Sequence, residues 1–145
     1  MIAIGADHGG FDLKEQVKKH LDERNIEYKD FGTFSGEAVD YPVIAKAVGK
    51  AVAKGEAECG ILVCGTGIGM SIAANKVKGI RAACCSDTFS ARFTKMHNNT
   101  NVLCFGGRVL GVGLALDIVD AYLDAEFEGG RHEKRVNMIM DIENN

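Results

Sequence analysis

Short apolar runs alternate along the chain with longer stretches in which apolar residues recur every three or four positions. This alternation is typical of β-α-β units stacked on a parallel sheet. Runs such as 61–63 contain no polar residue, as expected for central strands that helices cover on both faces. The pattern predicts an α/β fold with a five-stranded parallel sheet, whose strands we place at 2–6, 27–31, 60–64, 80–85 and 101–105.

Apolar positions with helical spacing predict the helices between these strands. Positions 13, 17 and 21 lie on one face of a first helix, and positions 44, 48 and 52 repeat that spacing after Pro42, which suits a first helical turn. In an open parallel sheet, ligands bind beyond the carboxyl ends of the strands. The residues that follow each strand are therefore the candidates for a functional site.

Two helical segments near the C-terminus differ in character. The segment 114–123 is apolar around most of its circumference, which favours a subunit interface. The last helix begins near Arg131, and its predicted apolar stripe consists of Val136, Ile139 and Met140. No repeat, low-complexity tract or linker interrupts the pattern, so we expect one domain over residues 1–145.

Composition narrows the classes of function. The chain has 145 residues and a net charge of -3 with both signs mixed, so it offers no basic stripe for nucleic acid or an anionic membrane. The apolar run at the N-terminus has no charged region before it and ends at Asp7, too early for a signal peptide or a spanning helix. We therefore expect a cytoplasmic protein with neither nucleic acid nor membrane as a partner.

The cysteines form neither a disulfide framework nor a zinc motif. There are five of them, an odd number, without a C-x-x-C pair or matching histidine spacing. Four lie in or beside apolar, strand-like runs, where a free cysteine behaves as a small hydrophobic residue. Cys64 differs because it ends a strand in front of a glycine-rich loop.

The loop after Cys64 reads Gly65-Thr66-Gly67-Ile68-Gly69, and a helical segment follows it. Its glycines allow successive N–H groups to point into a concavity that can hold an anion, an environment that favours a thiolate acting as base or nucleophile. The loop is neither a Walker motif, which needs Gly-Lys-Ser/Thr, nor a cysteine phosphatase motif, which needs arginine where Met70 stands. The simpler interpretation is a tight turn beside a buried cysteine.

Two further loops contain candidates with plain structural alternatives. Asp7 and His8 follow the first strand and could hydrogen-bond a polyol or a phosphate, although Asp7 could equally cap the next helix. His97 lies in the last turn of the predicted fourth helix, where it could shuttle protons or simply interact with the helix dipole.

Three arginines complete the set of candidates. Arg131 and Arg135 are four residues apart on the last helix and so project from one face, an arrangement that suits a phosphate dianion. A solvated basic face paired with Glu128 or Glu133 would explain them as well. Arg108, just after the fifth strand, has the same two interpretations.

Together these blocks resemble the type B ribose-5-phosphate isomerases, in the family shared with galactose-6-phosphate and allose-6-phosphate isomerase subunits. The resemblance extends over essentially the whole chain. It rests on G-A-D-H-G-G from Gly5, D-Y-P from Asp40, C-G-T-G-I-G-M-S-I-A-A-N-K from Cys64, H-N-N-T-N from His97, F-G-G-R from Phe105 and E-G-G-R-H-E-K-R from Glu128.

The resemblance implies a Rossmann-like three-layer sandwich that forms a homodimer, with each active site built from both subunits and with neither metal nor cofactor. It leaves larger oligomers open. It implies that Cys64 is the catalytic base, that Thr66 assists at the enediolate and that His97 opens the sugar ring. Some members of the family carry serine instead of the cysteine and use a later glutamate, but here that region holds Asn75.

The resemblance also implies how substrate is bound. His8, Arg131 and Arg135 match phosphate-binding positions. The other implied substrate-binding residues are Asp7, Tyr41, Gly65, Gly67, Ile68, Gly69, Asn98 and Arg108. The expected reaction is the interconversion of ribose 5-phosphate and ribulose 5-phosphate in the pentose phosphate pathway.

Two alternatives remain open at this point. The sequence does not distinguish pentose from hexose phosphate, since allose 6-phosphate and galactose 6-phosphate differ from the pentose by one hydroxymethylene group. A nucleotide-binding module is the alternative of a different class, because Asp87 lies about twenty residues beyond the glycine loop, where a ribose-binding acid would be found. That alternative gives Cys64 and the arginine pair no task.

Overall fold

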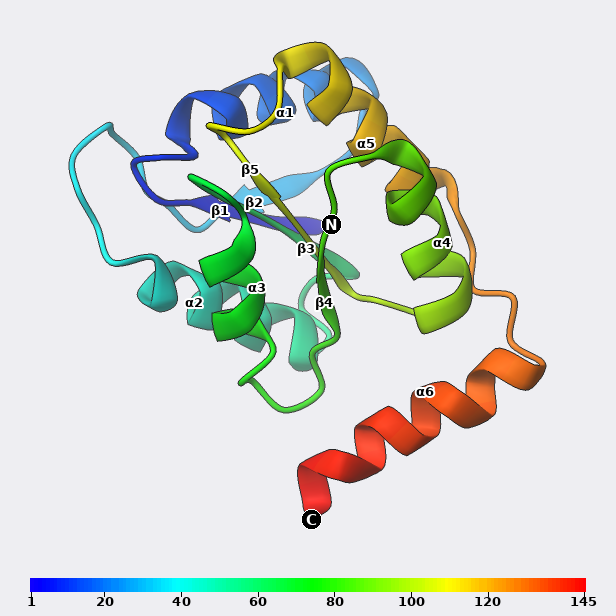
Figure 1. The fold of residues 1–145 in the computed structure, drawn as a ribbon. Helices are drawn as coiled ribbons and strands as arrows, with labels where there is room; N and C mark the ends of the chain where they lie inside the picture. Colours follow the sequence, from blue (N-terminus) through cyan, green and yellow to red (C-terminus); the bar gives the residue numbers. More distant parts are fainter.

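The computed structural model describes residues 1–145 and contains one sheet of five parallel strands (Figure 1). The strands are β1 (Ile2–Ala6), β2 (Tyr28–Asp30), β3 (Cys59–Cys64), β4 (Ala82–Cys84) and β5 (Val102–Gly106), and they lie in the order β2-β1-β3-β5-β4. The predicted α/β fold with five parallel strands is confirmed. Strand β4 is shorter than predicted, because Ile80 is buried as an apolar residue while its N–H donates to Val77 in a turn.

Helices cover both faces of the sheet (Figure 1). They are α1 (Phe11–Glu23), α2 (Tyr41–Ala53), α3 (Ile68–Ala74), α4 (Thr88–Asn98), α5 (Val112–Asp124) and α6 (Arg131–Asp141), with a 3-10 turn, η1 (Ile142–Asn144), at the end. Helices α1, α4 and α5 pack on one face around Ile4, Ile61 and Phe105, whereas α2 and α3 pack on the other around Leu62 and Cys104. The result is the expected three-layer sandwich. No helix is both long enough and apolar enough to cross a bilayer.

Helix α5 finds much of its burial within the chain. Ala115, Ile118, Val119 and Tyr122 are all fully buried in the core cluster that also contains side chains of α1 and α4. The Tyr122 hydroxyl donates to the carbonyl of Thr100 at 2.6 Å, and burial raises the pKa of this phenol. The apolar circumference of this segment is therefore largely explained by packing inside one chain.

Helix α6 extends away from the sandwich and has two different faces (Figure 1). On the face toward the rest of the chain, His132 and Val136 are buried and Met140 accepts a hydrogen bond from Arg81 at 3.3 Å. An exposed face carries Arg131, Arg135 and Met138, and Ile142 of the following turn η1 continues it. Of the predicted apolar stripe, Val136 is buried and Met140 half-buried, but Ile139 is 47% exposed.

Candidate active site

The carboxyl ends of β1, β3 and β5 form a compact platform at one edge of the sheet, which includes the point where strand order reverses between β1 and β3. The loops touch backbone to backbone. A Cβ added to Gly107 would lie 2.5 Å from the carbonyl oxygen of Gly9, and one added to Gly67 would lie 2.6 Å from the carbonyl carbon of Phe105. Gly67 also has a φ of 82°, which side chains disfavour. The glycines are thus required for the loops to converge.

Cys64, the last residue of β3, lies in this platform. Its side chain faces α2 and α3, the residue is 5% exposed, and the Gly67 N–H donates to Sγ at 3.1 Å. Burial raises the pKa of Cys59 and Cys85 to about 11 and also raises that of Cys84 and Cys104. Among the five cysteines, only Cys64 accepts a backbone N–H at its sulfur. That N–H is positioned to stabilise a thiolate.

Three predicted site residues surround the loop after Cys64. The exposed Thr66 hydroxyl accepts from the Ile68 N–H at 3.2 Å. Arg108 lies along Gly65, with its N–H 3.0 Å from the Gly65 carbonyl and its guanidinium 3.4 Å from where a Cβ of Gly65 would be. On the other side the Tyr41 ring packs so closely on Gly69 that a Cβ there would be 2.6 Å away.

Asp7 and His8 lie in the β1 loop, beside the Cys64 loop. Asp7 is 7% exposed, and its Oδ1 accepts the N–H groups of Gly9 at 2.9 Å and Gly10 at 3.1 Å. It therefore closes the turn before α1 and does not cap that helix, whose N-cap is Gly10. Oδ2 of Asp7 has no partner in the chain and is free to accept from a ligand. The exposed His8 accepts the Val39 N–H at its Nδ1, 3.3 Å away.

A buried lysine anchors the segment 31–40 that His8 contacts. Lys14 is fully buried, and its Nζ donates to both carboxylate oxygens of Asp30 at 2.8 Å and to the carbonyl of Thr33. Burial alone would raise the pKa of Asp30, but hydrogen bonds from Lys14 and Lys18 hold that pKa below its ordinary value. The rim of the platform is thus held from inside the same chain.

The remaining predicted site residues lie elsewhere. Helix α4 begins after Asp87, at the carboxyl edge beyond β4, and ends just before β5 begins at the opposite edge. Eleven helical residues span about 16 Å, so His97 and Asn98 are separated from the Cys64 platform by most of the length of the helix. Arg131 and Arg135, on the exposed face of α6, lie beyond them. A single chain therefore does not bring His97, Asn98 or the arginine pair to Cys64.

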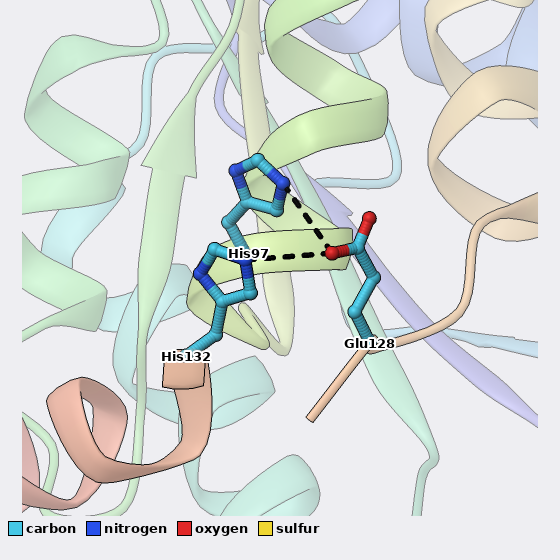
Figure 2. A group of neighbouring side chains, drawn as sticks. All are labelled: His97, Glu128 and His132. Atoms are coloured by element: carbon cyan, nitrogen blue, oxygen red, sulfur yellow. Dashed lines mark ion pairs between the residues drawn. The ribbon is translucent and has the colours of Figure 1, made fainter. Parts of the chain in front are cut away.

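These distant residues belong to a second cluster, shown in Figure 2. The rings of His97 and His132 stack with centroids 4.1 Å apart, and Glu128 Oε2 lies 3.7 Å from His97 Nε2 and 3.4 Å from His132 Nε2. Burial, then the charges of His97 and Arg131, lower the pKa of His132. The sequence patterns did not predict this cluster for Glu128 and His132. Their spacing of four residues was the only signal that the two side chains could meet.

Asp87, the residue that the nucleotide-binding alternative assigned to a ribose, caps a helix. Its carboxylate caps α4 by accepting the Ser90 N–H at 2.6 Å and the Ser90 hydroxyl at 2.8 Å, and these bonds lower its pKa. The acid expected to bind a ribose is thus committed to a helix cap. This observation weakens the nucleotide-binding alternative.

The largest groove of the chain, about 790 Å³, runs between α2 and α3. One end is formed by Tyr41 and Gly69, beside the platform; the apolar floor includes Ile72 and Val77, and Lys46, Lys50, Lys54, Lys76 and Lys78 line the sides. Apart from these ammonium groups, the groove presents a mostly apolar lining, which offers little to the hydroxyl groups of a sugar. Its size and apolar floor fit a protein segment better than a substrate.

Comparisons with known proteins identify the family of the chain. The model of a family described as Ribose/Galactose Isomerase matches residues 2–139. Ribose-5-phosphate isomerase B of Escherichia coli K12 is 56% identical over 142 residues, which cover 98% of this chain and 95% of that protein. The structure of Clostridium thermocellum ribose-5-phosphate isomerase B superposes with a TM-score of 0.97 at 53% identity, covering 99% of this chain and 97% of that one. The structure of Mycoplasma genitalium ribose-5-phosphate isomerase B with bound ribulose 5-phosphate superposes with a TM-score of 0.95 at 40% identity. The match covers 99% of this chain and 96% of that one.

Proposed function

The chain belongs to the ribose/galactose isomerase family and is therefore a sugar-phosphate isomerase; we propose that its reaction is the interconversion of ribose 5-phosphate and ribulose 5-phosphate. The observation that carries this proposal is the Cys64 sulfur, which ends β3 in front of a glycine-rich loop and accepts the Gly67 N–H of that loop. Aldose–ketose isomerisation needs one base that reaches two adjacent carbons, with donors for the oxyanion that develops between them. The Cys64 loop supplies both.

In the proposed reaction the Cys64 thiolate removes the proton from C2 and returns it to C1. The intermediate is a cis-enediolate, whose negative oxygen is stabilised by N–H groups of the loop other than those of Gly67 and Ile68, which donate to Cys64 and Thr66. Thr66, exposed above the loop, transfers protons between the oxygens. We assign Asp7 Oδ2 and the Tyr41 hydroxyl to sugar hydroxyls at the rim; Arg108 lies beside Gly65.

The proposal also requires a second copy of the chain. Sugar phosphates rest mainly as rings, and His97 is assigned to open the ring by protonating its oxygen. His97 and Asn98 lie at the opposite edge of the sheet from Cys64, and so they must act on the site of another subunit. A homodimer with two-fold symmetry completes two such sites at once, because each chain contributes its His97 to the site of the other chain.

The shape of α6 supports this homodimer. Its exposed face carries Arg131 and Arg135 in the first turns and the apolar Met138 and Ile142 further along. We place this face in the α2/α3 groove of the partner, with the arginines toward the Tyr41 end and the apolar residues on the floor. The partner's His8 then joins the two guanidinium groups around the phosphate. The exposed Asp141 would meet the lysines that line the groove.

The test is isomerisation of ribose 5-phosphate in excess chelator, with formation of ribulose 5-phosphate as the readout. Allose 6-phosphate and galactose 6-phosphate are run in parallel. We expect turnover of the pentose phosphate, faster than of either hexose phosphate. Turnover of a hexose phosphate alone would keep the mechanism and replace the substrate. No turnover of any of the three would refute the proposal.

A further inference from the structure

The cluster of His97, Glu128 and His132 has the composition of a metal site. Two imidazoles and one carboxylate converge from the end of α4, the segment before α6 and the first turn of α6 (Figure 2). Their candidate ligand atoms all lie within 4.8 Å of one another. Two histidines and a glutamate form a recurrent zinc ligand set in proteins, one that leaves a fourth position for water or another ligand.

The spacing of these atoms favours ligation over simple pairing. A charge-assisted hydrogen bond is about 2.7–2.9 Å long. The distances from Glu128 Oε2, 3.7 Å to His97 and 3.4 Å to His132, are both longer than that. Ligand atoms at bond lengths of about 2.0–2.2 Å from one tetrahedral ion are separated by about 3.3–3.6 Å. The two imidazole nitrogens lie within 4.8 Å of each other, and because the rings are nearly parallel, at 10°, both must turn about their side-chain bonds to direct their lone pairs at one ion.

The backbone around the cluster fixes the three side chains near one another. The Glu128 N–H donates to the carbonyl of Met96 at 3.0 Å, which ties the segment before α6 to the end of α4. The His132 N–H donates to Gly129 at 3.1 Å, and the edge of Phe93 packs against the His97 ring at 5.0 Å. His132 is only 8% exposed, whereas His97 and Glu128 remain open to solvent on one side. An ion could thus enter from that side.

We propose that His97, Glu128 and His132 bind a divalent transition-metal ion such as Zn²⁺, and that the bound ion withholds His97 from catalysis. The second half rests on the proposed function, in which His97 opens the sugar ring. An imidazole whose Nε2 coordinates a metal cannot use that nitrogen to transfer a proton. The ion would act as a reversible inhibitor of an enzyme whose chemistry needs no metal.

The binding test uses the full chain after treatment with chelator and desalting. Zn²⁺ is titrated calorimetrically, and Co²⁺ serves as an optical probe that reveals thiolate ligation by its charge-transfer band. We expect one ion per chain, no thiolate band, and affinity at least tenfold weaker in His132→Asn and in Glu128→Gln. The matched control is His20→Asn, which removes another histidine paired with a carboxylate, Asp120 at 2.8 Å, and should leave affinity unchanged. Unchanged affinity in both cluster variants, or a thiolate band, would overturn the site.

The activity test follows turnover of furanose ribose 5-phosphate as the site fills with Zn²⁺. We expect turnover to fall along the binding curve, to recover when chelator is added, and to resist zinc in Glu128→Gln. Full turnover by the saturated chain would refute the inhibition while leaving the binding site in place. A metal-free chain that turns over no sugar phosphate would instead refute the proposed function, and the binding titration would still decide whether the site exists.

Discussion

Cys64 and His97 are positioned by two different kinds of structure. Cys64 ends a central strand, is 5% exposed, and accepts a backbone N–H from a glycine-rich loop that packs backbone to backbone on its neighbours. His97 lies at the end of a surface helix, and its side chain is 35% exposed against another histidine and a glutamate. The geometry of the backbone-built platform is fixed once β1, β3 and β5 have formed. The side-chain cluster is shaped by α4 and α6, and α6 has one face with no partner in its own chain.

The contrast indicates how the work is divided. Removal and return of a carbon-bound proton tolerates little error in position, which favours a site built on rigid elements. Ring opening and phosphate binding rely on longer side chains that can be brought by another subunit. The predictions that follow test this division, beginning with the change that should have the largest effect.

Replacing Cys64 with alanine removes the proposed base and should lower turnover by about 10²–10⁴-fold. Substrate binding should remain, because the backbone amides are unchanged. The decisive measurement is exchange of the C2 proton with solvent, which should disappear. Cys84→Ser is the matched control: this exposed thiol lies at the end of β4, 3.6 Å from the Thr66 carbonyl, and its loss should leave turnover intact. Exchange that persists in Cys64→Ala would rule out the thiolate as base.

Mixing two inactive variants tests whether the Cys64 and the His97 that serve one site come from different chains. Cys64→Ala and His97→Asn each spoil both sites of a homodimer. Co-expression should restore about a quarter of wild-type turnover, because half of the dimers are mixed and each mixed dimer has one intact site. Homodimers of each variant, assayed separately, give the baseline. An activity no higher than that baseline would mean that each site uses a single chain.

His97→Asn alone should lower turnover of the furanose form by about 10²-fold, a value in the range for one general acid. An open-chain substrate, which skips ring opening, should be affected much less. Comparing kcat/KM for the two forms in the wild type and the variant measures the difference. Equal losses on both would argue against a role in ring opening.

Lys14→Met tests whether the platform is stable without a partner. The variant leaves Lys18 as the only cation paired with Asp30 and removes the donor to Thr33, so the free energy of unfolding should fall by about 2 kcal/mol. Urea unfolding at a series of protein concentrations measures it. The loss should be the same at every concentration. Lys19→Met, on the same helix, is the control expected to change little. A loss that grows on dilution would show that the partner supports the platform.

The smallest expected effect is the pH dependence that Asp30 contributes. Its pKa is lower in the folded chain than the ordinary value of about 3.9. Its contribution is therefore complete above about pH 4 and is lost as the pH falls through the lowered folded pKa. Wild-type stability should decline on acidification more steeply than that of Asp30→Asn. Parallel curves for the two proteins would assign the acid sensitivity to other groups.

Much of the fold follows from patterns that the chain displays openly. Unbroken apolar runs such as 61–63 predicted the central strands, and helical spacing predicted the helices on both faces. Strand β4 was predicted too long, because apolar residues such as Ile80 can be buried in turns as well as in a ladder. Periodicity reports burial and does not report which backbone groups are paired.

The candidate site was predictable in its local part only. Cys64 and its loop are adjacent in the sequence, so their proximity needed no tertiary information. That His97 lies at the far edge could have been inferred from the rule that a helix leaving the carboxyl edge of a parallel sheet ends at the other edge. The stack of His97 on His132 could not, because it depends on where the segment after α5 places α6.

The two faces of α6 have a consequence for how such a protein can evolve. One face is fixed to its own chain through Val136 and Met140, while the other presents Arg131 and Arg135 outward. After a gene duplication, one copy could lose its thiol and the other its outward arginines without abolishing the activity of their mixture. Each copy would then depend on the other, and two genes would be retained where one had sufficed. The proposed division of each site between chains would thus give a short mutational route from a homodimer to an obligate pair of unlike subunits.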